Sequence, residues 1–176
     1  MIKRFGFIRE KLEIKILILF ILRRISTPVS FDELTELALC DDGICYFVFT
    51  ECVAEMVDSG HLICRDGEYS ITKKGLRNGE LTENNLPFTV RAHLENTTFA
   101  YRSSRARNAM INTSHVTEPD GTCIVKLSLS DGIGEVVSIE LFTVNERQAL
   151  ALENGFRKSA ESIYSDLIEM ILGQSK

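Results

Sequence analysis

The sequence predicts an α+β protein in two parts: three helices and a β-hairpin, then a three-stranded antiparallel sheet with two packed helices. Two patterns of apolar residues lead to this prediction. Apolar residues recur at helical spacing up to about residue 58, and the period becomes two from about residue 107. We expect an N-terminal domain over 1–80, a linker and connecting helix over 81–105, and an α+β domain over 106–176.

The composition indicates a folded protein that carries a net negative charge. Of its 176 residues, 44% are hydrophobic and 26% charged, and the net charge is −5. Acidic balance argues against general nonspecific binding of nucleic acid. The longest apolar run, 16–22, is too short to cross a bilayer, and no signal-peptide cleavage pattern follows it. We therefore expect a soluble, cytoplasmic protein with no membrane segment.

Five cysteines are scattered along the chain without the two-residue spacing of a zinc or redox motif. They are Cys40, Cys45, Cys52, Cys64 and Cys123. An odd, irregular set of this kind is typical of reduced thiols packed as small apolar side chains. We expect no disulfide framework and no metal site.

The first predicted helix, Lys11–Ile25, is apolar on nearly every side. Such a helix must be covered on nearly every side, which a lone three-helix domain does not achieve. We therefore expect it to be clamped between its own domain and either the C-terminal domain or a second subunit.

Two shorter helices follow. Ser30 and Glu33 have the spacing of a capping box, which predicts a helix to about Ala38. Residues 41–43, Asp-Asp-Gly, predict a turn, and a third helix is expected over 45–58 and closed by Ser59-Gly60.

A β-hairpin is predicted over 61–72, with its turn at Asp66-Gly67 and a final helical turn that begins at Thr72. Three helices followed by a hairpin within about 70 residues is the order of a winged helix-turn-helix domain. The segment 59–75 resembles the wing of many bacterial regulators with this fold.

The second half begins with a polar linker over 79–85 and a connecting helix from Leu86-Pro87 to about Arg102. Alternation of apolar and polar residues then predicts an antiparallel meander. Its strands are expected near 109–117, 123–129 and 136–143, with helices after Asn145 and over 160–172.

Seven short segments of the chain, together with the order of its elements, match the pattern of a known family: 11–13, 17–19, 55–60, 69–72, 144–149, 154–158 and 163–164. On these segments the chain resembles the bacterial family called domain of unknown function 4364. It covers nearly the whole chain and implies a winged helix in front of a small α+β domain. It implies no known activity and therefore no catalytic residues.

DNA binding is one hypothesis for the N-terminal domain, because the third helix of this fold usually lies in the major groove. Helix 45–58, however, contains no Lys, Arg, Asn or Gln, the usual readers of guanine and adenine. Its candidate base contacts are Thr50 and Glu51, where the pattern of the resembled family carries glutamines. Glu51 can accept from cytosine, but a carboxylate without neighbouring cations repels phosphates.

Candidate phosphate contacts lie in and after the hairpin, at Arg65, Lys73, Lys74 and Arg77. A second basic patch is formed by Arg102, Arg105 and Arg107. Both sets also fit ordinary solvated surface, since acidic residues outnumber basic ones over 1–80.

No arrangement of residues indicates catalysis. The sequence has no nucleophile elbow and no phosphate-binding glycine loop, so we expect neither an enzyme nor a cofactor. Two hypotheses remain. The chain is either a homodimeric regulator of transcription that binds double-stranded DNA, with a C-terminal domain for dimerisation or sensing, or a winged helix that binds proteins and not DNA. The sequence identifies no small-molecule effector.

Overall fold

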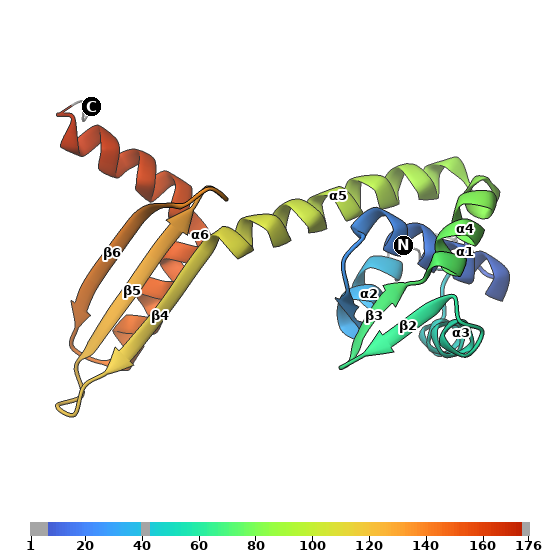
Figure 1. Ribbon diagram of the computed structural model, residues 1–176, viewed down its shortest axis with the longest axis horizontal. Coiled ribbons are helices and arrows are strands. Elements are labelled where there is room, and N and C mark those ends of the chain that lie inside the picture. The colour runs from blue at the N-terminus through green and yellow to red at the C-terminus, as the bar shows by residue number, and fades with distance from the viewer. Residues whose placement is uncertain (1–6, 40–42, 174–176) are drawn as a thin grey trace, which may run out of the picture. The chain divides into compact units, whose positions relative to one another are not determined.

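The computed structural model describes residues 7–39 and 43–173 and divides into two compact units at Arg102/Ser103. The first unit contains α1 (Lys11–Ile25), β1 (Val29–Ser30), α2 (Phe31–Ala38), α3 (Tyr46–Asp58), β2 (Leu62–Arg65), β3 (Glu68–Ile71), α4 (Lys73–Thr82), the 3₁₀ helix η1 (Glu83–Asn85) and the start of α5 (Phe88–Met110). The second contains β4 (Ile111–Thr117), β5 (Cys123–Ser130), β6 (Glu135–Thr143) and α6 (Glu146–Ile171). The described residues thus form the predicted α+β fold, and its two sheets are both antiparallel and three-stranded, whereas a hairpin alone was expected in the first unit (Figure 1).

The sheet of the N-terminal unit has the strand order β1–β3–β2. Its hairpin turns at Asp66 and Gly67, which have φ of 52° and 82°, the positive values that the predicted tight turn needs. Strand β1 was not predicted, because two residues are too few to show a period of two. Its Val29 is buried and pairs with Tyr69, which ties the chain before α2 to the hairpin.

Local signals in the sequence set the ends of several helices as predicted. The Ser30 and Glu33 side chains form the reciprocal capping box of α2. Thr72 Oγ1 accepts a hydrogen bond from the Gly75 amide at the start of α4. Gly60, with φ of 71°, closes α3. Cys40, Asp41 and Asp42, which the sequence places at and just before the turn, lie outside the described residues.

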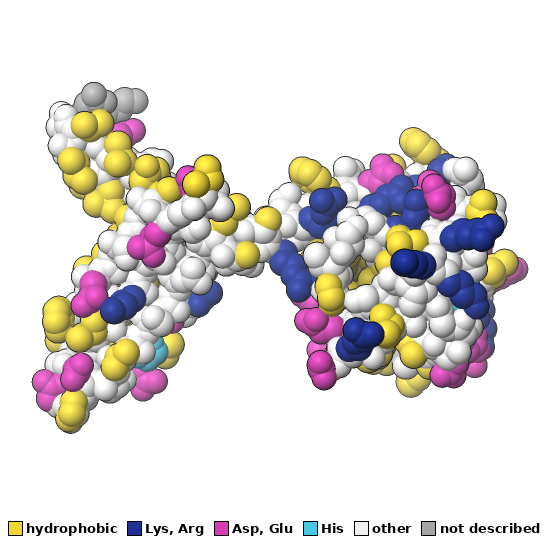
Figure 2. All heavy atoms as spheres, in the orientation of Figure 1, with side chains coloured by type: hydrophobic (Ala, Val, Ile, Leu, Met, Phe, Trp, Pro, Cys, Tyr) yellow, Lys and Arg dark blue, Asp and Glu magenta, His cyan; other side chains and the backbone are white. Residues whose placement is uncertain are grey.

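The C-terminal unit packs one face of the β4–β5–β6 sheet against α6. The core of this unit contains Ile111, Cys123, Val125, Leu127, Leu129, Ala149, Phe156 and Ala160. On the opposite face, Val116, Ile124 and Phe142 are cross-strand neighbours and form an apolar row. Figure 2 shows further apolar side chains on the last turns of α6, where Ile168, Met170 and Ile171 are exposed.

The two helices predicted at the C-terminal end are the two arms of α6, which meet at a kink just before residue 160, where the second helix was expected to begin. α6 runs through Ser159, whose φ of −134° and ψ of 22° interrupt the helical geometry. Arg107 lies at this kink and donates to the carbonyl oxygens of Arg157 and Lys158, at 2.9 and 3.4 Å. Its guanidinium also binds both carboxylate oxygens of Glu161. These bonds satisfy helix carbonyls that a kink leaves without partners.

Helix α1 is buried within the N-terminal unit, contrary to the expectation that the C-terminal domain or a second subunit must cover it. From Ile14 to Ile25, nine of its residues are buried. The helix contacts α2, α3, α4, η1 and β3, and its side chains share one core with Leu86, Val90 and Leu94. The unit can cover α1 on every side because it includes residues beyond 80, which were assigned to a linker and connecting helix.

Residues 79–85 are helical and packed, so the prediction of a polar linker is wrong. Gly79 is buried, and a Cβ there would lie 3.2 Å from the Leu19 Cβ and 2.7 Å from the Arg23 Cδ, so glycine lets α4 approach α1 closely. From the local sequence this glycine indicates a flexible linker. Its role is instead to allow close packing against α1, which lies about 60 residues earlier in the chain.

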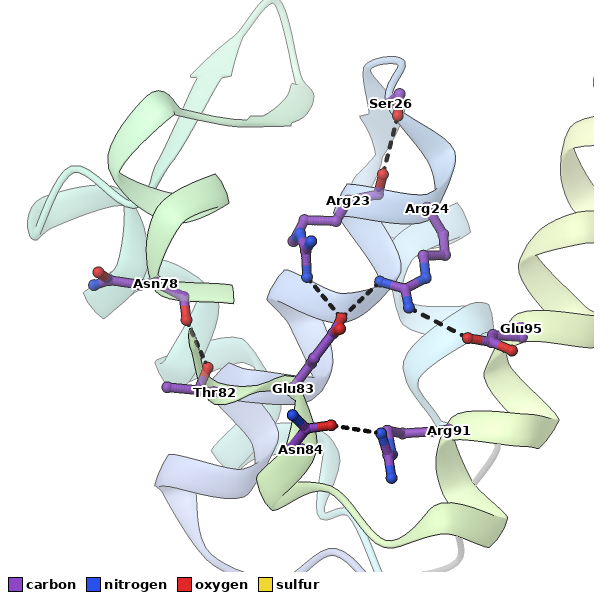
Figure 3. Close-up of polar contacts among 9 residues, drawn as sticks. All are labelled: Arg23, Arg24, Ser26, Asn78, Thr82, Glu83, Asn84, Arg91 and Glu95. Atoms are coloured by element: carbon purple, nitrogen blue, oxygen red, sulfur yellow. Dashed lines mark hydrogen bonds and ion pairs between the residues drawn. The ribbon is translucent and has the colours of Figure 1, made fainter. Parts of the chain in front are cut away.

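Glu83 holds η1 against α1 and is the centre of a polar cluster (Figure 3). Its carboxylate accepts from Arg23 Nη1 at 2.7 Å and from Arg24 Nη1 at 2.9 Å. Arg24 also reaches Glu95 of α5 at 3.2 Å. Burial opposes ionisation of Glu83, but the two guanidinium groups outweigh it and hold the pKa of this carboxyl below its ordinary value. The cluster therefore joins α1, η1 and α5, and the charges of its two arginines are balanced by those of Glu83 and Glu95.

The close packing of α4 predicts opposite effects for two helical glycines. In Gly75→Ala, the new Cβ overlaps the His61 carbonyl oxygen and lies 2.8 Å from the Ile71 Cγ1, so the backbone must shift. We expect the free energy of unfolding to fall by about 1 to 3 kcal/mol. The control is Gly155→Ala in α6, which meets nothing within 4 Å and should gain up to about 1 kcal/mol. Urea denaturation followed by circular dichroism measures both, and a neutral Gly75→Ala would contradict this packing.

Candidate functional site

The outer face of α3 is uncharged over most of its length. Phe49, Cys52, Val53 and Met56 turn into the core, whereas Phe47, Thr50, Glu51 and Ala54 are exposed. Phe47 is 80% exposed, a large fraction for an aromatic side chain. Val48 and Glu55 are half-buried. The surface that α3 offers to a partner therefore combines the apolar Phe47 and Ala54 with Thr50 and the carboxylate of Glu51.

The acidic residues of α3 are neutralised by α1, which the sequence analysis missed. Lys11 Nζ lies 2.6 Å from Glu51 and 3.0 Å from Glu55, and Lys15 Nζ lies 2.5 Å from Glu55. Hydrogen bonds from Lys15 and Lys11 lower the pKa of Glu55, and the bond to Glu51 is the main cause of the raised pKa of Lys11. The carboxylates of α3 thus have neighbouring cations, and the repulsion of phosphates expected from them is reduced. One turn separates Lys11 from Lys15 and Glu51 from Glu55, and this matched spacing was the available signal.

Three of the candidate phosphate contacts lie together at the start of α4. Lys73, Lys74 and Arg77 are exposed there. Lys74 Nζ donates to the Ser59 carbonyl oxygen at 2.7 Å, which places this ammonium group at the C-terminal end of α3. Figure 2 shows several Lys and Arg side chains on the visible face of the N-terminal unit. The start of α4 and the end of α3 therefore form one basic corner.

Arg65 lies at the other end of the hairpin from this corner. In the strand register Leu62 pairs with Ile71 at the base, and Arg65 pairs with Glu68 at the tip. Three residues of strand separate base from tip by about 10 Å. The tip carries Asp66 and Glu68 beside Arg65, so it is acidic on balance. The structure thus divides the set of four cations that the sequence grouped together.

The second basic patch lies on the last turns of α5, across the boundary between the two units. Arg102 ends the first unit, and Arg105 and Arg107 follow it on the same helix. Arg107 is engaged with Glu161 and the α6 carbonyl groups, and the hydrogen bond to Glu161 is the main cause of its raised pKa. Its role in the structure is to hold the kink of α6.

The cysteines, possible metal ligands and apolar helices remain to be placed. Cys45, Cys52, Cys64 and Cys123 are free thiols. Across residues 7–39 and 43–173, no three His, Cys, Asp or Glu side chains come together as a metal-binding group. Within the same residues, no helix combines the length and apolar character that crossing a membrane requires.

Comparison with known proteins gives one match. The family model described as domain of unknown function (DUF4364) matches residues 14–171. No curated protein and no solved structure matches the chain. The match spans both units, including the segments that carry the resemblance from residue 17 to residue 164. The chain therefore belongs to this family of unknown function.

Proposed function

We propose that the N-terminal unit is a winged helix-turn-helix and that the protein is a DNA-binding regulator of transcription. The sheet order β1–β3–β2, with α2 and α3 leading into the hairpin, supports this assignment. In such a domain α3 enters the major groove. The observation that carries the proposal is the basic corner of Lys73, Lys74 and Arg77 beside the end of α3. Its cations would contact phosphates on the flank of the groove that α3 occupies.

The exposed residues of α3 support a particular kind of base recognition. The side chains that usually read guanine or adenine, namely Arg, Lys, Asn and Gln, are missing from this helix. Phe, Ala and the Thr methyl group contact the 5-methyl group of thymine in the major groove. Phe47, Thr50 and Ala54 are these residue types, and all three are exposed. We therefore propose that α3 reads thymine methyl groups and that the sites it prefers are rich in A·T pairs.

The C-terminal unit is proposed to serve dimerisation or sensing. The apolar row of Val116, Ile124 and Phe142 lies on the sheet face opposite α6. The exposed Ile168 and Ile171 of α6 add apolar surface. Surfaces of this kind are typical of contacts between subunits. In a homodimer, two copies of α3 would read half-sites about one helical turn of DNA apart.

One observation favours a second function, in which the winged helix binds a protein and not DNA. Phe47 is the most exposed aromatic side chain of the described residues of the N-terminal unit, and Tyr46 beside it is 47% exposed. The two rings meet edge to face, with centroids 5.9 Å apart. Aromatic residues of this kind are enriched at the centres of protein interfaces.

Phosphate contacts by the basic corner predict a salt-dependent affinity for duplex DNA. A 30-base-pair alternating A-T duplex, titrated over a salt series, should show log affinity falling linearly with log salt. In K73Q/K74Q/R77Q the magnitude of that slope should fall by about 2 to 3, because each lost phosphate contact removes about 0.9. The control K126Q/R147Q/R157Q makes the same change of net charge in the other unit and should keep the slope. Absence of binding at low salt would overturn the proposal in favour of protein binding.

Readout through methyl groups predicts that uracil weakens binding. Replacing every thymine of the alternating A-T duplex by uracil removes the methyl groups and keeps all base-edge hydrogen-bonding groups. We expect affinity to fall about fourfold for each methyl group that α3 contacts, the value of burying one methylene-sized group. Conversely, a G-C duplex with 5-methylcytosine should bind more tightly than its unmethylated form. Phe47→Ala should reduce both differences and leave the salt slope unchanged. Equal affinities for the thymine and uracil duplexes would exclude this readout.

A further inference from the structure

A cavity of about 350 Å³ lies in the N-terminal unit between α1, the C-terminal end of α3, and α4. This volume is within the range of small-molecule sites in proteins. Its lining consists of an apolar group (Leu12, Ile16, Leu19, Met56, Leu81) and a polar group (Lys15, Ser59, His61, Asn78, Thr82). An apolar chamber with a few convergent polar groups is the usual form of a binding site for a small amphipathic molecule.

The apolar end of the cavity is open to solvent on its outer side. Ile16, Leu19 and Met56 are buried and form its floor. At its rim, Leu12 and Leu81 are 64% and 73% exposed, although almost every other apolar side chain of α1 is buried. Both leucines would lose contact with water if an apolar chain filled the cavity, which favours binding.

The polar end is organised around His61. Its Nδ1 lies 2.8 Å from Ser59 Oγ, and its Nε2 lies 2.7 Å from the side-chain nitrogen of Asn78. The backbone of Asn78 lies in α4, where its main-chain carbonyl oxygen accepts a hydrogen bond from Thr82 Oγ1 (Figure 3). One amide hydrogen of Asn78 is left after the bond to His61. The ring is thus fixed in position, and Asn78 retains a donor for a ligand.

The charges around His61 favour an anionic group. Burial, followed by the positive charges of Lys74 and Lys15, lowers the pKa of His61, so the ring stays neutral near pH 7. Lys15 lines the cavity and lies beside Glu55, which Lys11 also contacts. Within the described chain, Lys74 has no carboxylate partner and binds the Ser59 carbonyl oxygen. A negative group at this end would meet the remaining amide hydrogen of Asn78 and the ammonium group of Lys15, with Lys74 nearby.

We propose that this cavity binds a small monocarboxylic acid with an apolar chain. The chain lies between Leu12, Ile16 and Leu81, and the carboxylate lies beside Lys15 and Asn78. This inference goes beyond the proposed function and does not depend on it. Met56 and Ser59 line the cavity at the C-terminal end of α3, and Lys74 of the basic corner binds the Ser59 carbonyl oxygen. The cavity therefore adjoins the elements to which DNA contacts are assigned.

Calorimetry on the full chain without DNA tests the proposal with hexanoate, octanoate, decanoate and octan-1-ol. Each added methylene should raise affinity about fourfold until the cavity is full. Octanoate should bind at least about tenfold more tightly than octan-1-ol, since a hydrogen bond to a charged group is roughly twice as strong as a neutral one. No binding by any of the acids, or equal affinity of acid and alcohol, would overturn it.

Matched variants assign the binding to this cavity. Leu81→Ser should weaken octanoate several-fold, whereas Leu76→Ser, on the same helix and 43% exposed but outside the lining, should not. Lys15→Gln should weaken octanoate and leave octan-1-ol unchanged. Lys11→Gln removes the other partner of Glu55 and should change neither. Equal effects within either pair would place the ligand elsewhere. Since no DNA is present, these results are independent of whether the protein binds DNA.

Discussion

The burial of α1 determines how the N-terminal unit is built. A helix that is apolar on nearly every side has to be enclosed, and α2 and α3 reach only part of it. The remainder is covered by α4, η1 and the start of α5, whose Val90 and Leu94 join the same core. Two details follow from this enclosure: Gly79 lets α4 come close to α1, and Glu83 ties η1 to the arginines at the end of α1. The segment after the hairpin is therefore part of the core.

The same enclosure decides which surfaces are left for function. With α1 inside, the N-terminal unit presents the outer face of α3, the hairpin and α4 to partners. Lys11 and Lys15, on the polar edge of α1, compensate the acids of α3. Where α1, α3 and α4 meet, their side chains do not fill the space completely, and the cavity beside His61 results. Phosphate binding is thus proposed for α4, base recognition for α3 and ligand binding for the cavity between these helices and α1.

Features set by neighbouring residues were predictable from the sequence, and features set by distant ones were not. The capping box of Ser30 and Glu33 and the turn at Asp66-Gly67 depend on a few consecutive residues, and both are confirmed. Residues 79–85 have the polar composition of a linker. Their packing depends on α1, which lies about 60 residues earlier, so the local sequence does not show it. The break in α6 at Ser159 matches the predicted boundary between two helices, whereas the bonds of Arg107 at this kink were not predicted, because Arg107 comes from another helix. The candidate cations were found by type, but only the strand register shows that Arg65 is remote from the other three.

Amide hydrogen exchange along α1 tests most directly whether the N-terminal unit encloses this helix by itself. Exchange would be compared between the full chain and a fragment of residues 1–102, the boundary at which the chain divides. If the unit is self-sufficient, the amides of residues 14–22 remain as strongly protected in the fragment as in the full chain, because their cover lies within residues 7–102. Loss of protection, or aggregation of the fragment, would show that the helix depends on the C-terminal unit and would contradict this account.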